Sequence, residues 1–186
     1  MPKQRLARIL VGLVAASAGA ALFAGGGGRP APRPPSVPIV SHDPYFSIWS
    51  PSDRLADAWP VHWTGRAHAL SALVRIDGQG YRLMGREPWG TPAMTQTRLD
   101  VFPTRTVYTF VQAGVELVLT FLCPLLPDDL DVLSRPLTYV TARARSADGG
   151  RHRLQLYFDA CGEAAVNTTD QKVVWGRYEV PGLDVL

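Results

Sequence analysis

Alternation of hydrophobic and polar side chains, interrupted by tight-turn residues, is the feature that most constrains the fold of this chain. In VELVLTFL, residues 115–122, every second side chain is large and hydrophobic, and Glu116 and Thr120 fall between them. This period of two residues is that of a β-strand with one buried face, whereas a helix repeats every 3.6 residues. Ala113-Gly114 and the hydrophobic residues 107–111 precede the segment, so the sequence predicts a β-hairpin here.

Two more segments have the same form. In HALSALVRIDGQGYRLMG the pair Asp77-Gly78 separates two hydrophobic runs, and in LTYVTARARSADGGRHRLQLYFDA residues 148–150 separate two alternating runs. Asp-Gly between such runs is a strong hairpin signal, so we expect two further hairpins. KVVWGRYEV, residues 172–180, predicts another strand, and LPDDLDVLSRP predicts one helical turn between prolines.

Repeated hairpins without a long helical period predict an all-β fold, an antiparallel β-sandwich of supersandwich-like form. Pro181-Gly182 is a further turn signal, and residues 183–186 begin another hydrophobic segment with no turn after it. We therefore expect the sandwich to be incomplete at its C-terminus.

The N-terminal residues differ from the rest in composition. MPKQRLAR is basic, and a hydrophobic run that ends in small residues follows it, which is typical of a secretory signal peptide. We assign residues 1–24 to this signal and the Gly/Pro-rich residues 25–36 to a linker. The folded part is then 37–186. The expected location is extracellular or in the cell envelope, with membrane contact only through an uncleaved signal.

The positive charge of the chain belongs to its N-terminus. Five of its basic residues and no carboxylate lie in residues 1–36, so the formal charge of +3 becomes −2 for the rest. Nucleic acid is therefore a poor candidate partner. The two cysteines, Cys123 and Cys161, either form a disulfide in an exported protein or remain buried thiols, and the sequence leaves both alternatives open.

Two segments, SHDPYFSIWS and WPVHWTGRAH, concentrate imidazole, carboxylate, guanidinium and aromatic groups. If they meet in the fold, they provide an environment suited to a polar small molecule. In the competing interpretation Asp43 caps a turn before Pro44 and the histidines satisfy backbone groups at strand ends. The candidate binding residues are His42, Asp43, Trp49, Trp59, His62, Trp63, Arg66 and His68.

Other chemistry has little support in the sequence. Asp128, Asp129 and Asp131 lack the glycine and the downstream glutamate of a calcium loop, and no zinc-ligand spacing occurs. A Gly-x-Ser-x-Gly motif is missing, and neither cysteine lies in a recognisable catalytic context. We therefore expect no metal and no cofactor, and we assign no catalytic residue.

Several long segments resemble the N-terminal region of the glutaminase A family, the secreted glutaminases of fungi and bacteria. They are PIVSHDPYFSIWSPSDRLADAWPVHWTGRAHALSALVRIDG, PTRTVYTF, LTFLCPLLPDDLDVLSRPLTYV and LYFDACGEAAVNTTDQKVVWGRYEVPGLDVL. The resemblance implies a β-sandwich followed by a helical α/α-toroid domain, and hydrolysis of L-glutamine to glutamate and ammonia. This chain ends before the helical domain would begin.

The resemblance implies that this chain alone is a non-catalytic portion and meets glutamine only together with the missing helical domain. The eight candidate residues would then face the crevice between the two domains and shape a pocket or an interface. Two alternatives remain: a carbohydrate-binding or scaffold β-sandwich module, and the accessory domain of a sandwich-plus-toroid glycoside hydrolase.

Overall fold

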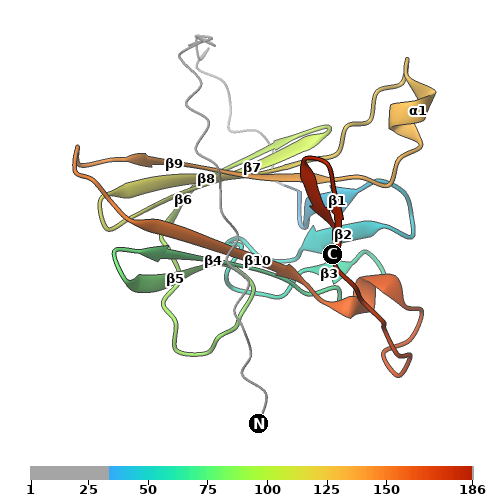
Figure 1. The fold of residues 1–186 in the computed structure, drawn as a ribbon, viewed down its shortest axis with the longest axis horizontal. Coiled ribbons are helices and arrows are strands. Elements are labelled where there is room, and N and C mark those ends of the chain that lie inside the picture. The colour runs from blue at the N-terminus through green and yellow to red at the C-terminus, as the bar shows by residue number, and fades with distance from the viewer. Residues whose placement is uncertain (1–33, 186) are drawn as a thin grey trace. The chain divides into compact units, whose positions relative to one another are not determined.

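The computed structural model describes residues 34–185, and the contacts of the chain divide it into two units, residues 1–32 and 33–186. The signal peptide expected at 1–24 and most of the linker expected at 25–36 lie outside the described residues. Twelve strands and two short helices occur in the described part. Figure 1 shows how they are arranged. They are β1 (Val37–Ser41), β2 (Ser47–Ser50), β3 (Val61–His62), β4 (Leu70–Ile76), β5 (Gln79–Met84), β6 (Gln96–Phe102), β7 (Arg105–Gln112), β8 (Val115–Leu122), α1 (Leu130–Leu133), β9 (Tyr139–Ser146), β10 (Leu154–Ala160), η1 (Gly162–Ala165), β11 (Tyr178–Val180) and β12 (Leu183–Val185).

Two antiparallel sheets form the layers of the predicted all-β sandwich. One has the strand order β6-β7-β8-β9, and the other has the order β10-β4-β5. Their facing side chains share one hydrophobic core, to which β4 contributes Val74 and Ile76 and β8 contributes Leu117 and Leu119. The alternation in residues 115–122 is thus that of a strand with one buried face, because its four odd-numbered side chains are buried and the even-numbered ones are half-exposed.

Two of the three predicted hairpins are confirmed. β4 pairs with β5 through a turn in which Asp77 and Gly78 have φ angles of 49° and 95°. β7 pairs with β8 over eight residue pairs, and its turn residues Ala113 and Gly114 also have positive φ. Turns of this kind match the twist of the strands they connect, which is why Asp-Gly and Ala-Gly occur here.

The prediction of a third hairpin, over residues 139–160, is wrong. β9 pairs with β8 and β10 pairs with β4, so residues 147–153 carry the chain from one sheet to the other. Hydrogen bonds attach this connection to the turns of the two confirmed hairpins. Ala147 N–H donates to the Gly114 carbonyl at 2.7 Å, and Asp77 N–H donates to the Arg153 carbonyl at 3.0 Å. The Asp-Gly-Gly residues therefore form a corner between the two sheets instead of a two-stranded turn.

A third sheet, β1-β2-β3, carries the N-terminal candidate residues. It joins the sandwich through β1, where the Thr106 hydroxyl donates to the Pro38 carbonyl at 2.7 Å. Strand β2 begins at Ser47, because residues 42–46 form a turn. Ile39, Ile48 and Leu55 from this region are fully buried in the common core.

The C-terminal part adds strands and exposed side chains. All eight residues of β9 are exposed, and β11 pairs only with β12 around the predicted Pro181-Gly182 turn. The predicted helical turn is α1, and Asp129 caps it by accepting a hydrogen bond from Val132 N–H at 3.0 Å. None of the helices in residues 34–185 is long and apolar enough to cross a membrane.

Candidate functional site

The turn between β1 and β2 is built by Asp43. Its Oδ1 accepts hydrogen bonds from the Tyr45 N–H at 2.7 Å and the Phe46 N–H at 2.8 Å. These backbone donors, first that of Phe46, lower the pKa of Asp43, so the carboxylate stays ionised. His42 Nε2 lies 3.8 Å from Asp43 Oδ2, beyond hydrogen-bond distance. The turn-capping interpretation of Asp43 therefore agrees with the geometry.

The second candidate segment is a tight loop that lies against this turn. His62 N–H donates to the Arg66 carbonyl at 2.8 Å, and Gly65, with a φ of 86°, closes the loop. The Pro44 carbonyl lies 3.0 Å from His62 Nε2 and accepts a hydrogen bond from Trp63 Nε1 at 2.6 Å. Because a carbonyl only accepts, His62 Nε2 is the donor in this contact. The structure thus brings together the 42–46 and 61–66 segments.

His68 follows this loop and is almost completely buried. Its ring centroid lies 5.1 Å from that of His62, and its Nδ1 has no hydrogen-bond partner in the described part of the chain. Burial, followed by the neighbouring His62, lowers the pKa of His68, while Glu163 acts in the opposite direction. The His68 imidazole is therefore neutral at pH 7.

Residues 161–169 complete the site, and sequence reasoning missed them. Cys161 N–H donates to the Ala69 carbonyl at 2.9 Å, because β10 pairs with β4 up to that point. Cys161 Sγ donates to Glu163 Oε2 at 3.1 Å, and Arg66 Nη1 donates to the Asn167 carbonyl. Only the register between β4 and β10 brings these residues to His68, so no local sequence pattern could have identified them.

Three adjoining hollows surround these groups. Arg66, His68, Glu163 and Asn167 line the first, of about 230 Å³. The second, of about 550 Å³, adds Tyr45 and Trp63 to Arg66 and His68. The third, of about 770 Å³, lies between Trp59, Tyr157, Asp159, Cys161 and Glu163. The first hollow shares Arg66 and His68 with the second and Glu163 with the third. We call the three hollows together, along the ends of β3, β4 and β10, the Arg66–Glu163 hollow.

The predicted candidate residues divide into two sets. Trp59, His62, Trp63, Arg66 and His68 line the hollow. His42, Asp43 and Trp49 do not line it: Asp43 builds the turn beside it, and Trp49 Nε1 donates to the Ser47 hydroxyl at 2.8 Å. Trp63 is exposed, whereas Trp49 and Trp59 are partly buried.

The hollow contains one thiol, that of Cys161. Burial, followed by the Glu163 carboxylate, raises the pKa of the Cys161 thiol, which disfavours the nucleophilic thiolate. Both cysteines are free thiols, which resolves the alternative left open by the sequence. Within residues 34–185 no group of three or more His, Cys, Asp or Glu side chains could hold a metal ion. A guanidinium, a carboxylate, an amide and two imidazoles are suited to a small polar ligand that carries both charges.

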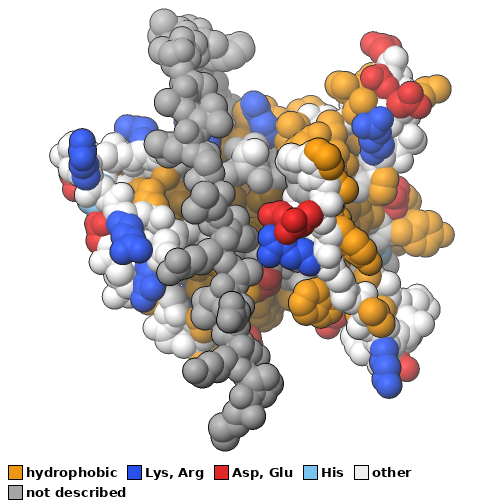
Figure 2. All heavy atoms as spheres, viewed as in Figure 1, with side chains coloured by type: hydrophobic (Ala, Val, Ile, Leu, Met, Phe, Trp, Pro, Cys, Tyr) orange, Lys and Arg blue, Asp and Glu red, His pale blue; other side chains and the backbone are white. Residues whose placement is uncertain are grey.

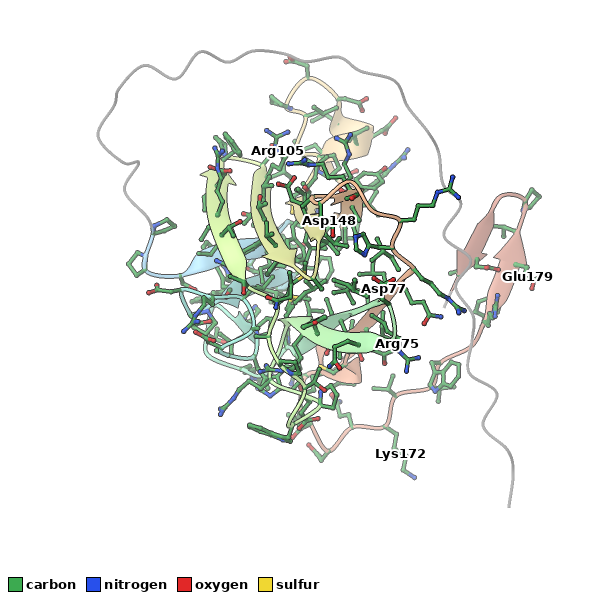
Figure 3. All side chains as sticks on the ribbon, turned by 90° about the vertical axis from the view of Figure 1, so that its left-hand side faces the viewer. Arg75, Asp77, Arg105, Asp148, Lys172 and Glu179 are labelled. Carbon is green, nitrogen blue, oxygen red and sulfur yellow. The ribbon has the colours of Figure 1, made fainter. Side chains whose placement is uncertain are left out.

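A second titratable cluster lies at the opposite, corner end of β4 and β10, where Figure 3 labels Asp77 and Asp148. His152 Nδ1 lies 2.7 Å from Asp77 Oδ2, and His152 Nε2 lies 3.0 Å from Asp148 Oδ1. The two carboxylates raise the pKa of His152, and the hydrogen bond from His152 is the main cause that lowers the pKa of Asp148 to about 2. This Asp77–His152–Asp148 cluster links the turn after β4 to the connection 147–153, and its role is structural.

The fold is that of an all-β protein of the antiparallel sandwich class, and a hollow lined by ionisable and aromatic side chains lies at one end of it. Models of two domains of unknown function match the chain, DUF4964 over residues 28–94 and DUF5127 over residues 104–185. Glutaminase A of Aspergillus oryzae is 32% identical over 151 residues, which cover 77% of this chain and 22% of that protein. The chain therefore spans about a fifth of the length of the curated relative it matches, and the match lies in the N-terminal part of that relative. No solved structure matches the chain.

Proposed function

We propose that this chain is the N-terminal, non-catalytic β-sandwich portion of a secreted glutaminase-like amidohydrolase. The observation that carries the proposal is the similarity to glutaminase A over 77% of the chain. In this proposal the complete protein hydrolyses L-glutamine to L-glutamate and ammonia. The reaction needs an activated nucleophile or water and an acid for the leaving ammonia, and we assign both to the region outside this chain.

The Arg66–Glu163 hollow fits the task of holding the substrate. Glutamine presents a carboxylate, an ammonium group and a neutral amide. Arg66 matches the carboxylate, Glu163 matches the ammonium group, and the Asn167 side chain matches the amide. His68 beside them is neutral and almost buried, so it adds no third charge to those of Arg66 and Glu163. This chain then contributes binding groups and leaves the reacting groups to the helical domain.

Glutamine binding by the full chain tests the proposal directly. Tight binding of glutamine requires the helical domain in this proposal, but the binding groups of the hollow belong to this chain. At high concentrations of L-glutamine we therefore expect nuclear magnetic resonance signals of the His68 ring to shift, and Arg66→Met to weaken this residual binding about tenfold, since a charge-assisted hydrogen bond is lost. Arg86→Met is the matched control, because Arg86 stacks on Trp89 and does not line the hollow. Ammonia release from glutamine should stay at the level of the blank, and clear turnover by this chain would show that it is catalytic.

A carbohydrate-binding module is the second candidate function. Tyr45 is 90% exposed and Trp63 is 61% exposed, and both line the same hollow. Exposed aromatic rings of this kind can stack on sugar rings. Titration with cellobiose and maltose, followed by Trp fluorescence, separates the two functions: we expect no change, whereas quenching lost in Trp63→Ala would favour the carbohydrate module.

Export is part of the same proposal. The basic and hydrophobic residues 1–24 would direct the chain across a membrane and be removed. N-terminal sequencing of the exported protein should find a new terminus after Ala20 or Ala24. An intact Met1 on membrane-bound protein would indicate an uncleaved anchor instead.

A further inference from the structure

The sandwich has one closed side and one open side. β5 and β6 are the edge strands of the closed side, where the Met94 N–H donates to the Arg82 carbonyl at 2.8 Å and the Arg82 N–H donates to the Pro92 carbonyl at 2.8 Å. β9 and β10 are the edge strands of the other side. In residues 34–185 no strand pairs with their outer edges, and the connection 147–153 joins them directly (Figure 1).

The open side exposes side chains that point toward the core. The register places Val140 opposite Phe121 and Ala142 opposite Leu119, on the face of the sheet that is buried in β8. Phe121 and Leu119 are each 1% exposed, whereas Val140 is 38% exposed. On β10, Leu154 lies opposite the buried Ile76 and is also 38% exposed. The hydrophobic row of β9 therefore has no covering layer, whereas on β10 Leu154 is exposed and Leu156 and Phe158 pack against the core.

The outer row of β9 is basic. Arg143 and Arg145 lie on the face opposite the hydrophobic row, next to Val118 and Glu116 of β8. Arg145 makes two hydrogen bonds to the Glu116 carboxylate, at 2.6 Å and 2.7 Å. Arg143 is exposed and forms no ion pair with any described residue. A strand added to β9 would therefore meet an uncompensated positive charge on one face and a hydrophobic row on the other.

These features select one kind of occupant. Pairing of β9 with β9 of a second copy would bring two Arg143-Arg145 rows together, and like charges across strands are destabilising. A strand with alternating hydrophobic and acidic side chains places its acidic groups beside the basic row and its hydrophobic groups beside the hydrophobic row. Its backbone hydrogen-bonds to the free N–H and C=O groups of the edge. Nearly four-fifths of the Aspergillus oryzae relative lies outside the segment that matches this chain, and this is the source to which we assign the strand.

We propose that the free edge of β9, its hydrophobic row and the exposed Leu154 of β10 form a docking surface for an acidic amphipathic β-strand from the remainder of a longer polypeptide. The strand extends the four-stranded sheet, and its hydrophobic side chains lie beside Val140, Ala142 and Ala144 on the core-facing side. The inference rests on the part of the proposed function that makes this chain a portion of a longer protein. It does not depend on the reaction, so the two proposals can fail separately.

The test uses the full chain and overlapping ten-residue peptides that cover the unmatched part of the Aspergillus oryzae glutaminase A. Fluorescence anisotropy measures binding, and hydrogen–deuterium exchange locates it. We expect the peptides that bind to alternate hydrophobic and acidic residues and to slow exchange in residues 139–146. Arg143→Glu should weaken their binding about fivefold, the range expected when an attractive cross-strand pair becomes repulsive. Lys172→Glu, an equal charge change at an exposed position outside the sheets, should leave binding unchanged.

Three results would overturn the proposal. The first is that no peptide of the relative slows exchange in β9. The second is that Arg143→Glu and Lys172→Glu have equal effects, because the basic row then has no part in recognition. The third is a dimer in size-exclusion chromatography with light scattering whose β9 is protected without peptide, since a second copy would then be the occupant. Loss of glutamine binding with intact strand docking would refute only the proposed function.

Discussion

Residues 37–123 and residues 124–185 have the same alternating pattern but differ in how much they bury. Every buried side chain of the described residues lies in the first part, between Val37 and Cys123. In the second part none is buried, and 13 of the 19 large hydrophobic side chains that are exposed occur there. In Figure 2 such side chains reach the surface on the side of α1 and β11–β12. Alternation in the sequence therefore shows which side chains share a face of the sheet. Whether that face is buried depends on a second layer of structure that packs against it.

The same comparison shows that the two matched domain families do not form two cores. The DUF4964 match ends at residue 94 and the DUF5127 match begins at residue 104. Nevertheless β4 from the first match pairs with β10 from the second over seven residue pairs. Met94 and Tyr108, on either side of the boundary, belong to one hydrophobic core. The two families therefore describe parts of one sandwich.

Truncation of one leucine in each part should give the largest difference in the free energy of unfolding. Leu119 on β8 is 1% exposed and Leu154 on β10 is 38% exposed. Leu119→Ala leaves a cavity in a closed core and should lower the free energy of unfolding by about 2–5 kcal/mol. Leu154→Ala should cost about 1 kcal/mol, because part of the side chain is already in water. Urea denaturation measures both, and equal losses would show that the second part is as well buried as the first.

The strands could be predicted from the sequence, but their partners could not. The turns at 77–78 and 113–114 specify local pairs, because only two residues separate the strands. Residues 147–153 look the same in sequence, yet hydrogen bonds from Ala147 and Arg153 to distant turns make them a corner. The hydrophobic row of β9 was also predictable as a face, whereas its exposure depends on which strand lies across from it.

Gly114 connects the two parts and gives the next largest effect. Its φ is 72°, and a Cβ added there would collide with the Asp148 carboxylate of the second part. Gly114→Ala should therefore lower the free energy of unfolding by about 2 kcal/mol or more, since left-handed strain and the collision add. Gly149→Ala is the control, because its φ is 82° but nothing lies within 4 Å of its added Cβ. It should cost about 1 kcal/mol. Equal losses would mean that the corner moves aside freely.

The Asp77–His152–Asp148 cluster makes the attachment of the second part dependent on pH. The pKa of His152 is raised above its ordinary value of 6.5, so its contribution is complete below pH 6.5 and is lost as the pH rises through the raised pKa. The pKa of Asp148 is lowered from 3.8 to about 2, so its contribution is present above pH 3.8 and is lost as the pH falls toward 2. The cluster is therefore strongest between about pH 4 and 6.5.

Stability measured from pH 3 to 9 in the native chain and in His152→Gln checks this window. The difference between the two should be largest near pH 5 and should shrink on both sides. Burial lowers the pKa of His68, so its titration has the opposite sign, but it is common to both proteins and cancels in the difference. A difference in stability that does not vary with pH would show that His152 contributes through packing and not through its charge.

The candidate site was predictable to the extent that its residues are close in sequence. Residues 59–68 were identified because aromatic, imidazole and guanidinium groups occur together, and Arg66 and His68 do line the hollow. Cys161 and Glu163 were not identified, because only the pairing of β10 with β4 brings them there. Asp43 was a good candidate by residue type, but its carboxylate is engaged by two backbone N–H groups.

The smallest effect is expected when the C-terminal hairpin is removed. Val174 is 95% exposed and Trp175 is 80% exposed, and β11 and β12 pair only with each other. A chain that ends at Gln171 therefore loses little buried surface, and its free energy of unfolding should change by less than about 0.5 kcal/mol. Circular dichroism is the appropriate probe, because the deletion removes one tryptophan. A loss larger than about 1 kcal/mol would mean that the hairpin packs against the sandwich in solution.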